Sequence, residues 1–267
     1  MTTAPAASTD APTALAPADP APLQPLLSDA VIVLRAPTQV WSDRDGAVGT
    51  AAVHGIYHGD VRHVRALTAS CDDSPIEWIS TAPDGPSRIV FGGVLRGIDD
   101  TTPDPKVRLL RERTVADGRV SETWTLRSRV NAAIRTTLRL RVHPEFALLH
   151  EVKSGHARPQ RTEVAIEAGS AHVSAGPQGL ALTAAGAEVA SGAEFVEASW
   201  EVEVPAFGEA AVTWELALRD DTLVVGGAAA PARWDAAPVA AGVRDPRVAR
   251  RPPRRPAPAV LSSRSSS

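Results

Sequence analysis

The residues of this 267-residue chain that are best suited to chemistry lie in a polar stretch in its first quarter. The stretch begins with Ser-Asp-Arg-Asp-Gly at 42–46 and continues through a histidine-rich segment at 54–63. Carboxylates, imidazoles and guanidinium groups this close together permit four interpretations. They are a metal site, a serine hydrolase, a pair of glycosidase carboxylates, and a loop held in place by charged hydrogen bonds.

Metal binding and nucleophilic catalysis each need a pattern that this stretch does not show. Imidazole and carboxylate groups are good metal ligands, which makes His54, His58, Asp60 and His63 the candidates. If these residues lay on one strand, however, His58 and Asp60 would share a face and His63 would lie on the other. A serine hydrolase would present its nucleophile in a Gly-x-Ser-x-Gly turn, which the sequence lacks. We therefore predict neither a metal site nor a serine nucleophile.

A glycoside hydrolase needs two carboxyl groups, an acid and a base or nucleophile, that flank the bond to be cleaved. Asp43, Asp45 and Asp60 supply carboxylates, but Arg44 or Arg62 lies close to each of them in the sequence. A neighbouring guanidinium group lowers the pKa of a carboxyl group, which is the wrong direction for a general acid. Aspartate and arginine alternating around a glycine turn instead favour charge-assisted hydrogen bonds that position a loop.

A second polar cluster, His143–Gly155, contains one further candidate. Its Glu151 is interpreted either as a catalytic or sugar-binding carboxylate or, more simply, as the partner of a nearby base. We predict no catalytic residue in either cluster. The candidates for loop positioning or substrate binding are Asp43, Arg44, Asp45, Tyr57, Asp60, Arg62 and Glu151.

The elements that must position these residues are predicted to be strands. In Ile134–Val142, and again in Trp124–Val130, Trp200–Val204 and Val212–Leu218, apolar side chains occupy alternate positions, which is the period of a strand with one buried face. Pro205–Glu209 predicts a hairpin-like connection between the last two. Further candidate strands are Ala30–Leu34, Val64–Ala69, Ile76–Ser80, Arg88–Phe91, Val107–Val115, Glu163–Ile166, Ala171–Val173 and Leu180–Thr183. Many short strands without a long helical pattern predict an all-β fold, an antiparallel two-sheet β-sandwich.

The composition agrees with this class of protein. With 43% hydrophobic residues, 22% charged residues and a net charge of −3, the chain is typical of a soluble globular protein. We predict no membrane span and no nucleic-acid partner. The single cysteine, Cys71, rules out an intramolecular disulfide and fits a cytoplasmic location, and no cofactor is predicted.

The two ends of the chain differ in composition from its centre. Residues 1–27 are rich in Ala and Pro, contain no Lys or Arg, and lack the apolar core of a secretory signal. Residues 226–267 combine Gly and Ala with an Arg-Pro run at 250–256 and a serine-rich end. We therefore predict a disordered lead over 1–27, one β-sandwich domain over 28–225, and a disordered tail over 226–267.

The two polar clusters, in this order and with this separation, resemble the N-terminal domain of bacterial glycogen debranching enzyme-like proteins, the amylo-alpha-1,6-glucosidase relatives. Four motifs over about Ala30–Leu218 carry the resemblance. Ser-Asp-Arg-Asp-Gly is intact, and Arg111-Glu112-Arg113, with Glu122 and Trp124 after it, fits the third motif. The second motif is kept at Gly55, Tyr57, Asp60 and Arg62, with Ile56 and Val61 substituted. The last is kept at Phe146, Ala147, Leu149, Glu151, Val152 and Gly155, whereas Leu148, His150 and Lys153 depart from it and Leu148 replaces an acid.

This resemblance implies a β-sandwich placed beside a large helical toroid that carries the catalytic carboxylates. The residues after Val225 are too few, and too rich in Pro, Gly, Arg and Ser, to build such a toroid. We therefore expect a truncation or a reading-frame change after about Arg250, and a domain that is inactive alone. The implied partners are a helical glycosidase domain, in cis in relatives and in trans here, and an α-glucan.

Two other functions stay open at this point. One is a stand-alone carbohydrate-binding module in which Trp41, Tyr57 or Trp78 stacks on sugar rings. The other is a small glycoside hydrolase that uses Asp43 or Asp60 together with Glu151. If the helical partner is absent, we expect exposed apolar surface on the face where it would sit.

Overall fold

A computed structural model of the chain describes residues 29–98 and 104–223. Over these residues nearly all regular structure is β-strand, in two antiparallel sheets, as the sequence predicted. The predicted lead, 1–27, and the predicted tail, 226–267, lie outside the described residues.

The first sheet has seven strands. In spatial order they are β1 (Val31–Arg35), β2 (Thr38–Ser42), β3 (Gly55–His58), β4 (Val61–Cys71), β9 (Ile134–Leu148), β14 (Val196–Val204) and β13 (Glu188–Ser191). Every neighbouring pair is antiparallel. The register between β4 and β9 shifts near Val64, so that this end of the sheet is irregular.

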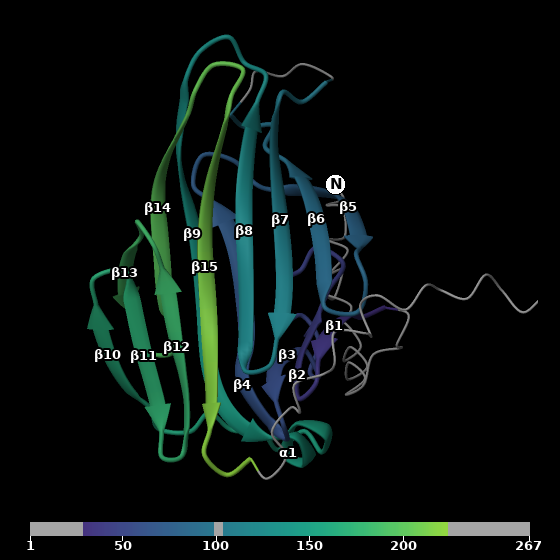
Figure 1. Ribbon diagram of the computed structural model, residues 1–267, viewed down its shortest axis with the longest axis vertical. Coiled ribbons are helices and arrows are strands. Elements are labelled where there is room, and N and C mark those ends of the chain that lie inside the picture. The colour runs from purple at the N-terminus through teal and green to yellow at the C-terminus, as the bar shows by residue number, and fades with distance from the viewer. Residues whose placement is uncertain (1–28, 99–103, 224–267) are drawn as a thin grey trace, which may run out of the picture. The chain divides into compact units, whose positions relative to one another are not determined.

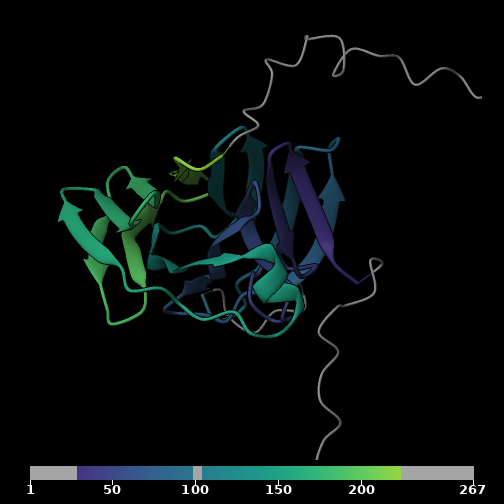
Figure 2. The same ribbon diagram turned by 90° about the horizontal axis from the view of Figure 1, so that it is seen from below.

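The second sheet has eight strands. In spatial order they are β10 (Glu163–Glu167), β11 (Ser170–Ala175), β12 (Gln178–Ala184), β15 (Glu209–Asp220), β8 (Arg119–Ser128), β7 (Val107–Ala116), β6 (Arg88–Val94) and β5 (Glu77–Pro83). All of its neighbouring pairs are antiparallel as well. Figure 1 shows β15 in the middle of this sheet. The short helix α1 (Leu149–Lys153) lies at the lower end of the strands in Figure 1 and faces the viewer in Figure 2.

The core lies between the inner faces of the two sheets. On β9 the predicted alternation is confirmed, because Leu138, Leu140 and Val142 are fully buried. They meet the buried face of the second sheet, where Trp124 of β8 packs at a tilt against Trp200 of β14, with ring centroids 5.7 Å apart. Aromatic pairs in this geometry stabilise a core beyond the area that they bury.

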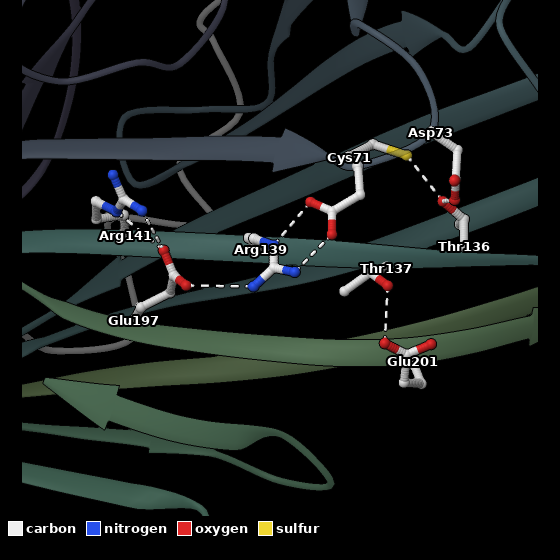
Figure 3. A network of polar contacts seen from close by, with 9 residues as sticks. Cys71, Asp73, Thr136, Thr137, Arg139, Arg141, Glu197 and Glu201 are labelled. Atoms are coloured by element: carbon white, nitrogen blue, oxygen red, sulfur yellow. Dashed lines mark hydrogen bonds and ion pairs between the residues drawn. The ribbon is translucent and has the colours of Figure 1, made fainter.

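The outer face of β9 carries a row of arginines paired with acids on its neighbours (Figure 3). Arg139 contacts both carboxylate oxygens of Asp72, at 2.7 and 2.5 Å, and also reaches Glu197 of β14 at 3.3 Å. Arg141 contacts the same Glu197 at 2.7 Å. Hydrogen bonds from Arg139 hold the pKa of Asp72 below its usual value. These charges form a cross-strand surface network in which Arg141 and Glu197 lie directly opposite each other on β9 and β14.

One predicted connection is wrong. Pro205–Glu209 does not close a hairpin, because β14 pairs with β9 and β13 in the first sheet whereas β15 pairs with β12 and β8 in the second. The two strands each bury one face in the shared core, with Trp200 and Trp214 as their buried indoles. The loop therefore carries the chain from one layer to the other, an alternative that strand periodicity alone does not distinguish from a hairpin.

Candidate functional site

The Ser-Asp-Arg-Asp-Gly motif begins the loop between β2 and β3, defined here as residues 43–54. Both of its carboxylates fold the loop on itself. Asp43 accepts hydrogen bonds from the Arg44 backbone N–H at 2.7 Å and from the Thr50 hydroxyl at 3.1 Å. Asp45 accepts one from the Ala47 backbone N–H at 2.7 Å. The side chain of Arg44 is exposed, and its carbonyl accepts a hydrogen bond from the hydroxyl of Thr81 on β5.

Beneath this half of the loop lie two buried arginines of β7, which share one carboxylate of β8. Glu122 accepts hydrogen bonds from Arg111 at 3.0 Å and from Arg113 at 2.6 Å. The same arginines donate to the loop backbone, Arg111 to the Asp45 carbonyl at 3.2 Å and Arg113 to the Gly46 carbonyl at 2.7 Å. All three charged residues are about 1% exposed. These arginines thus connect the core of the sandwich to the backbone of the motif.

The electrostatics of this triad favour its charged form. Burial alone would raise the pKa of Glu122, but the charges of Arg111 and Arg113, with hydrogen bonds from Arg111 and the Trp124 indole, outweigh it and lower that pKa to about 2. Burial lowers the pKa of Arg113, against the attraction of Glu122. The guanidinium carbon of Arg111 also lies 5.2 Å from the ring centroid of Trp78 and 5.4 Å from that of Trp124, within cation–π range.

Gly46 is required at this position by close packing. Its φ of +81° is one that L-residues with side chains rarely adopt. A Cβ atom there would also lie 2.8 Å from the ring of the buried Phe91. The glycine of the motif therefore lets the loop backbone approach the core closely enough to meet Arg113.

The other half of the loop is held by a second buried ion pair. Arg62 of β4 donates to Glu145 of β9 at 2.5 Å, and both side chains are less than 10% exposed. The same guanidinium donates to the carbonyls of Ala52 at 2.7 Å and His54 at 3.2 Å. Tyr57 is 2% exposed, and its hydroxyl donates to the Val53 carbonyl at 2.8 Å. Burial raises the pKa of this hydroxyl, so it stays protonated at neutral pH.

The last two sequence candidates lie at the junction of a turn and the helix. Asp60 is exposed in the turn between β3 and β4, and its carbonyl accepts a hydrogen bond from the Leu149 backbone N–H at 2.7 Å. Glu151 accepts one from the Leu148 backbone N–H at 2.9 Å and so caps α1. Leu148, which replaces the acid of the resembled motif, lines an open hollow of about 590 Å³ together with Asp60.

The candidate residues therefore form three groups rather than one. Asp43, Arg44 and Asp45 form the first part of the loop, Tyr57 and Arg62 hold its second part, and Asp60 and Glu151 flank the start of α1. The carboxylates of Asp43, Asp45 and Glu151 accept hydrogen bonds from nearby backbone N–H or hydroxyl groups. This is the arrangement of a positioned loop and a capped helix.

The histidines are arranged differently from the expectation. His58 and His63 were expected on opposite faces of one strand, but their ring centroids lie 6.0 Å apart. The reason is that Gly59 and Asp60 form a turn, so the two residues lie on adjacent strands, β3 and β4, whose register is also shifted by a bulge. Nδ1 of His58 lies 3.0 Å from the Thr38 hydroxyl, and Nε2 of His63 lies 3.0 Å from the Arg219 carbonyl. Within residues 29–98 and 104–223, no three His, Cys, Asp or Glu side chains gather as a metal site would require.

Four residues of the site were not among the site candidates, although the first three belong to the third motif of the resemblance: Arg111, Arg113, Glu122 and Glu145. A signal for three of them was present in the alternation. Arg111 and Arg113 fall in phase with the buried Val107, Leu109 and Val115 of β7, and Glu122 falls in phase with the buried Val120 and Trp124 of β8. Charged residues in the buried phase of two adjacent strands predict an internal ion pair. Glu145 carried no comparable signal, because the register near it is irregular.

Fold and site together define an antiparallel β-sandwich domain with a loop held by buried arginines. Residues 33–218 match a family model described as the N-terminal domain of (some) glycogen debranching enzymes. Because this match spans well over half of the sequence, the chain belongs to that family. The resemblance drawn from the motifs is thereby confirmed.

Solved structures with a similar arrangement show low sequence identity. A putative aldose 1-epimerase from Escherichia coli K12 shares 5% identity over 71% of this chain and 98% of its own, with a TM-score of 0.46. A galactose mutarotase-like protein from Lactobacillus casei shares 8% sequence identity over 71% of this chain and 100% of its own, with a TM-score of 0.46. A putative kojibiose phosphorylase from human microbiome shares 12% over 61% of this chain and 23% of its own, with a TM-score of 0.40. Nothing about the chemistry of this chain follows from these similarities.

No curated protein gives a significant match to the sequence. Among the helices of residues 29–98 and 104–223, none has the length and apolar character needed to span a membrane.

Proposed function

We propose that this chain is a non-catalytic domain of α-glucan metabolism that packs against a helical glycosidase domain and positions a loop at its face. The helical domain belongs to the same polypeptide in relatives and acts in cis or in trans here, in the cytoplasm. Membership of the family of debranching-enzyme N-terminal domains supports the assignment to α-glucan metabolism. The structural support comes from how the loop of residues 43–54 is held.

The observation that carries the proposal is that three buried arginines hold four carbonyls of this loop. Arg111 and Arg113 bind the carbonyls of Asp45 and Gly46, and Arg62 binds those of Ala52 and His54. Buried ion pairs add little net stability compared with apolar packing of similar volume. Three buried ion pairs in contact with one loop therefore favour a role in fixing the conformation of that loop. A surface that another domain recognises needs such a fixed conformation.

The arrangement of the carboxylates supports a non-catalytic role. Glu151 is bound to the first turn of α1, whereas Asp43 and Asp45 are bound within the loop. A hydrolase would need two of them directed at one bond. We therefore expect the purified chain to release no glucose from a branched dextrin, even at high concentration.

Reconstitution tests the proposal. The helical glycosidase domain of a debranching enzyme of this family, produced without its own N-terminal domain, is mixed with the full chain. We expect a complex in size-exclusion chromatography and a higher rate of glucose release from branched dextrin than the helical domain gives alone. Arg44→Ala, at the exposed part of the loop, should weaken the complex, whereas Arg127→Ala on the outer face of β8 should not. Failure to form a complex, or glucose release by the chain alone, contradicts the proposal.

A stand-alone carbohydrate-binding module is the second candidate, because Trp41 is half-buried and its indole N–H is oriented by the side chain of Gln39 at 3.0 Å. Tyr57 is too deeply buried to stack on a sugar, and Trp78 already packs beneath Arg111. Titration with maltoheptaose, followed by tryptophan fluorescence in the wild type and in Trp41→Phe, tests this candidate. A saturable change that Trp41→Phe removes would favour it over the assembly role.

A further inference from the structure

The hollow of about 590 Å³ beside Asp60 is formed by four segments that are distant in sequence. They are the turn between β1 and β2, the turn between β3 and β4, the end of β9, and the residues that follow β15. Its walls include Leu34, Pro37, Asp60, Leu148, Asp220 and Leu223. Hollows at which several elements end are common sites of recognition because each element contributes a side chain.

Hydrogen bonds tie these walls to one another. The Gly59 backbone N–H donates to the Pro37 carbonyl at 3.1 Å, which joins the first two turns. The Leu149 N–H donates to the Asp60 carbonyl at 2.7 Å, which joins the second turn to the end of β9. The end of β15 is joined to β4 by Nε2 of His63, which lies 3.0 Å from the Arg219 carbonyl. Within this last segment, the Asp220 carboxylate accepts hydrogen bonds from the N–H and the hydroxyl of Thr222 at 2.9 and 2.6 Å. The hollow is thus formed before any partner binds, which lowers the entropy cost of binding.

The chemistry of the lining is aliphatic and acidic. Leu34 and Leu148 are 41% and 40% exposed, so both present apolar surface to solvent, although Ile79 and Phe207 are more exposed. Asp60 and Asp220 supply two carboxylates, and no Lys, Arg or His is found among the described lining residues. No aromatic side chain lines the hollow within that described part either, so a pyranose ring would lack the flat surface on which sugars usually stack.

We infer that this hollow is a socket for a protein partner, namely an aliphatic side chain flanked by a Lys or Arg on the surface of the helical glycosidase domain. This inference rests on the proposed function and adds to its interface a second contact, at the end of β2 and β3 opposite the loop of residues 43–54. The aliphatic side chain covers Leu34 and Leu148, and the cation lies against Asp60 and Asp220. Charge complementarity and the two exposed leucines select this occupant over a neutral glucan.

Isothermal titration with the helical glycosidase domain, produced as above, tests the inference on the full chain. We expect Leu148→Ser and Asp60→Lys each to weaken binding about tenfold or more, because both alter the centre of the contact. The matched controls are Ile166→Ser, an aliphatic residue on β10 that is as exposed as Leu148, and Glu163→Lys, an exposed acid on the same strand. Both controls should bind as the wild type does. Circular dichroism melting of each variant checks that it is folded.

A second measurement detects the contact at the hollow directly and does not depend on a loss of affinity. Because Cys71 is buried, a dye that reacts with thiols will label Leu148→Cys at the hollow and Ile166→Cys on β10 selectively. The emission of an environment-sensitive dye should shift at position 148 when the helical domain is added, and not at position 166.

The outcomes separate this inference from the proposed function. If the wild type does not bind the helical domain, both fail. If the wild type binds, but the hollow variants bind equally well and the dye at position 148 does not respond, only the socket is overturned. If maltoheptaose, rather than the helical domain, shifts the dye at position 148, the hollow is a glucan site and the inference is wrong.

Discussion

Replacing Glu122 by glutamine tests the physical basis of the loop support most directly. The substitution keeps the shape of the side chain but removes the one negative charge that Arg111 and Arg113 share in the core. Two buried guanidinium groups are then left without a counterion. Breaking a buried ion pair by removing one partner is far more costly than never having formed the pair.

The magnitude follows from two independent arguments. The pKa of Glu122 falls from 4.5 to about 2 on folding, which corresponds to roughly 3 kcal/mol of stabilisation of the charged form. Loss of one member of a buried pair typically costs about 3–5 kcal/mol. We therefore expect Glu122→Gln to reduce the free energy of unfolding by about 3–5 kcal/mol at pH 7. For a domain of this size, that reduction lowers the melting temperature by roughly 6–20 °C.

The pH dependence gives a second signature. Since the pKa of Glu122 is lower in the folded state than in the unfolded chain, the unfolded chain takes up the proton first as the pH falls. The stabilisation by Glu122 is complete above about pH 4.5 and is lost as the pH falls toward 2. Urea unfolding at a series of pH values should show this loss in the wild type and a smaller one in Glu122→Gln.

The control is Glu215→Gln on the neighbouring strand β15. Its carboxylate contacts Arg119 at 3.0 Å, and both side chains are at least 40% exposed. An exposed pair of this kind contributes about 1 kcal/mol or less. If Glu122→Gln melts within about 2 °C of this control, the two arginines do not depend on Glu122 and the reasoning is refuted.

Three further predictions concern the same supports. Arg62→Lys keeps the charge but loses the contacts of the guanidinium group with the carbonyls of Ala52 and His54. Amide hydrogen exchange should therefore accelerate at residues 51–54 and not at 43–47. Equal acceleration in both parts would contradict the view that the two halves of the loop are held separately. A triple variant replaces the buried charges by apolar side chains: Arg111→Met, Arg113→Leu, Glu122→Leu. Its free energy of unfolding should stay within about 2 kcal/mol of the wild type, while the amides of residues 43–47 exchange faster. Unchanged exchange would show that these arginines do not hold the loop. Burial lowers the pKa of His63 below its value of 6.5 in the unfolded chain, so the free energy of unfolding should fall as the pH drops below 6.5. In urea titrations, His63→Gln should reduce this dependence on pH, whereas His172→Gln, at an exposed histidine, should not. An unchanged dependence in His63→Gln would contradict the prediction.

The strands with strict alternation could be predicted from the sequence. In β14, in β15 and in β9 as far as Val142, the buried positions recur at every second residue, so that strand type and buried face followed from the sequence. The bounds followed less closely, because β9 continues to Leu148 and β14 begins at Val196. The strands β2 and β3 were not predicted, because β3 has four residues, begins at a glycine, and is buried on both sides. Val40 and Ile56 belong to the core between the sheets, whereas Gly55 and Tyr57 of β3 are covered on the other side by Arg62 and the loop. These are long-range contacts that a local pattern does not contain.

The site was predictable in its parts but not in its arrangement. The Asp-Arg alternation predicted a loop shaped by charged hydrogen bonds, and Asp43 and Asp45 bind backbone N–H groups within the loop. It suggested that Arg44 and Arg62 would pair with the neighbouring aspartates, whereas Arg62 pairs with Glu145, which is 83 residues away in the sequence. Pairing at that distance depends on the order of β4 and β9 in the sheet, and the order of strands is a property of the whole fold.

The central place of β15 in its sheet has a consequence for synthesis on the ribosome. β8 and β12 are translated earlier, yet the strand that pairs with both of them is the last one of the described chain. Until β15 leaves the exit tunnel, the eight-stranded sheet stays split into two pieces, each with an open hydrogen-bonding edge. A nascent chain arrested just before Glu209 should therefore be a substrate for chaperones, whereas one arrested well after Asp220 should already be protected from protease.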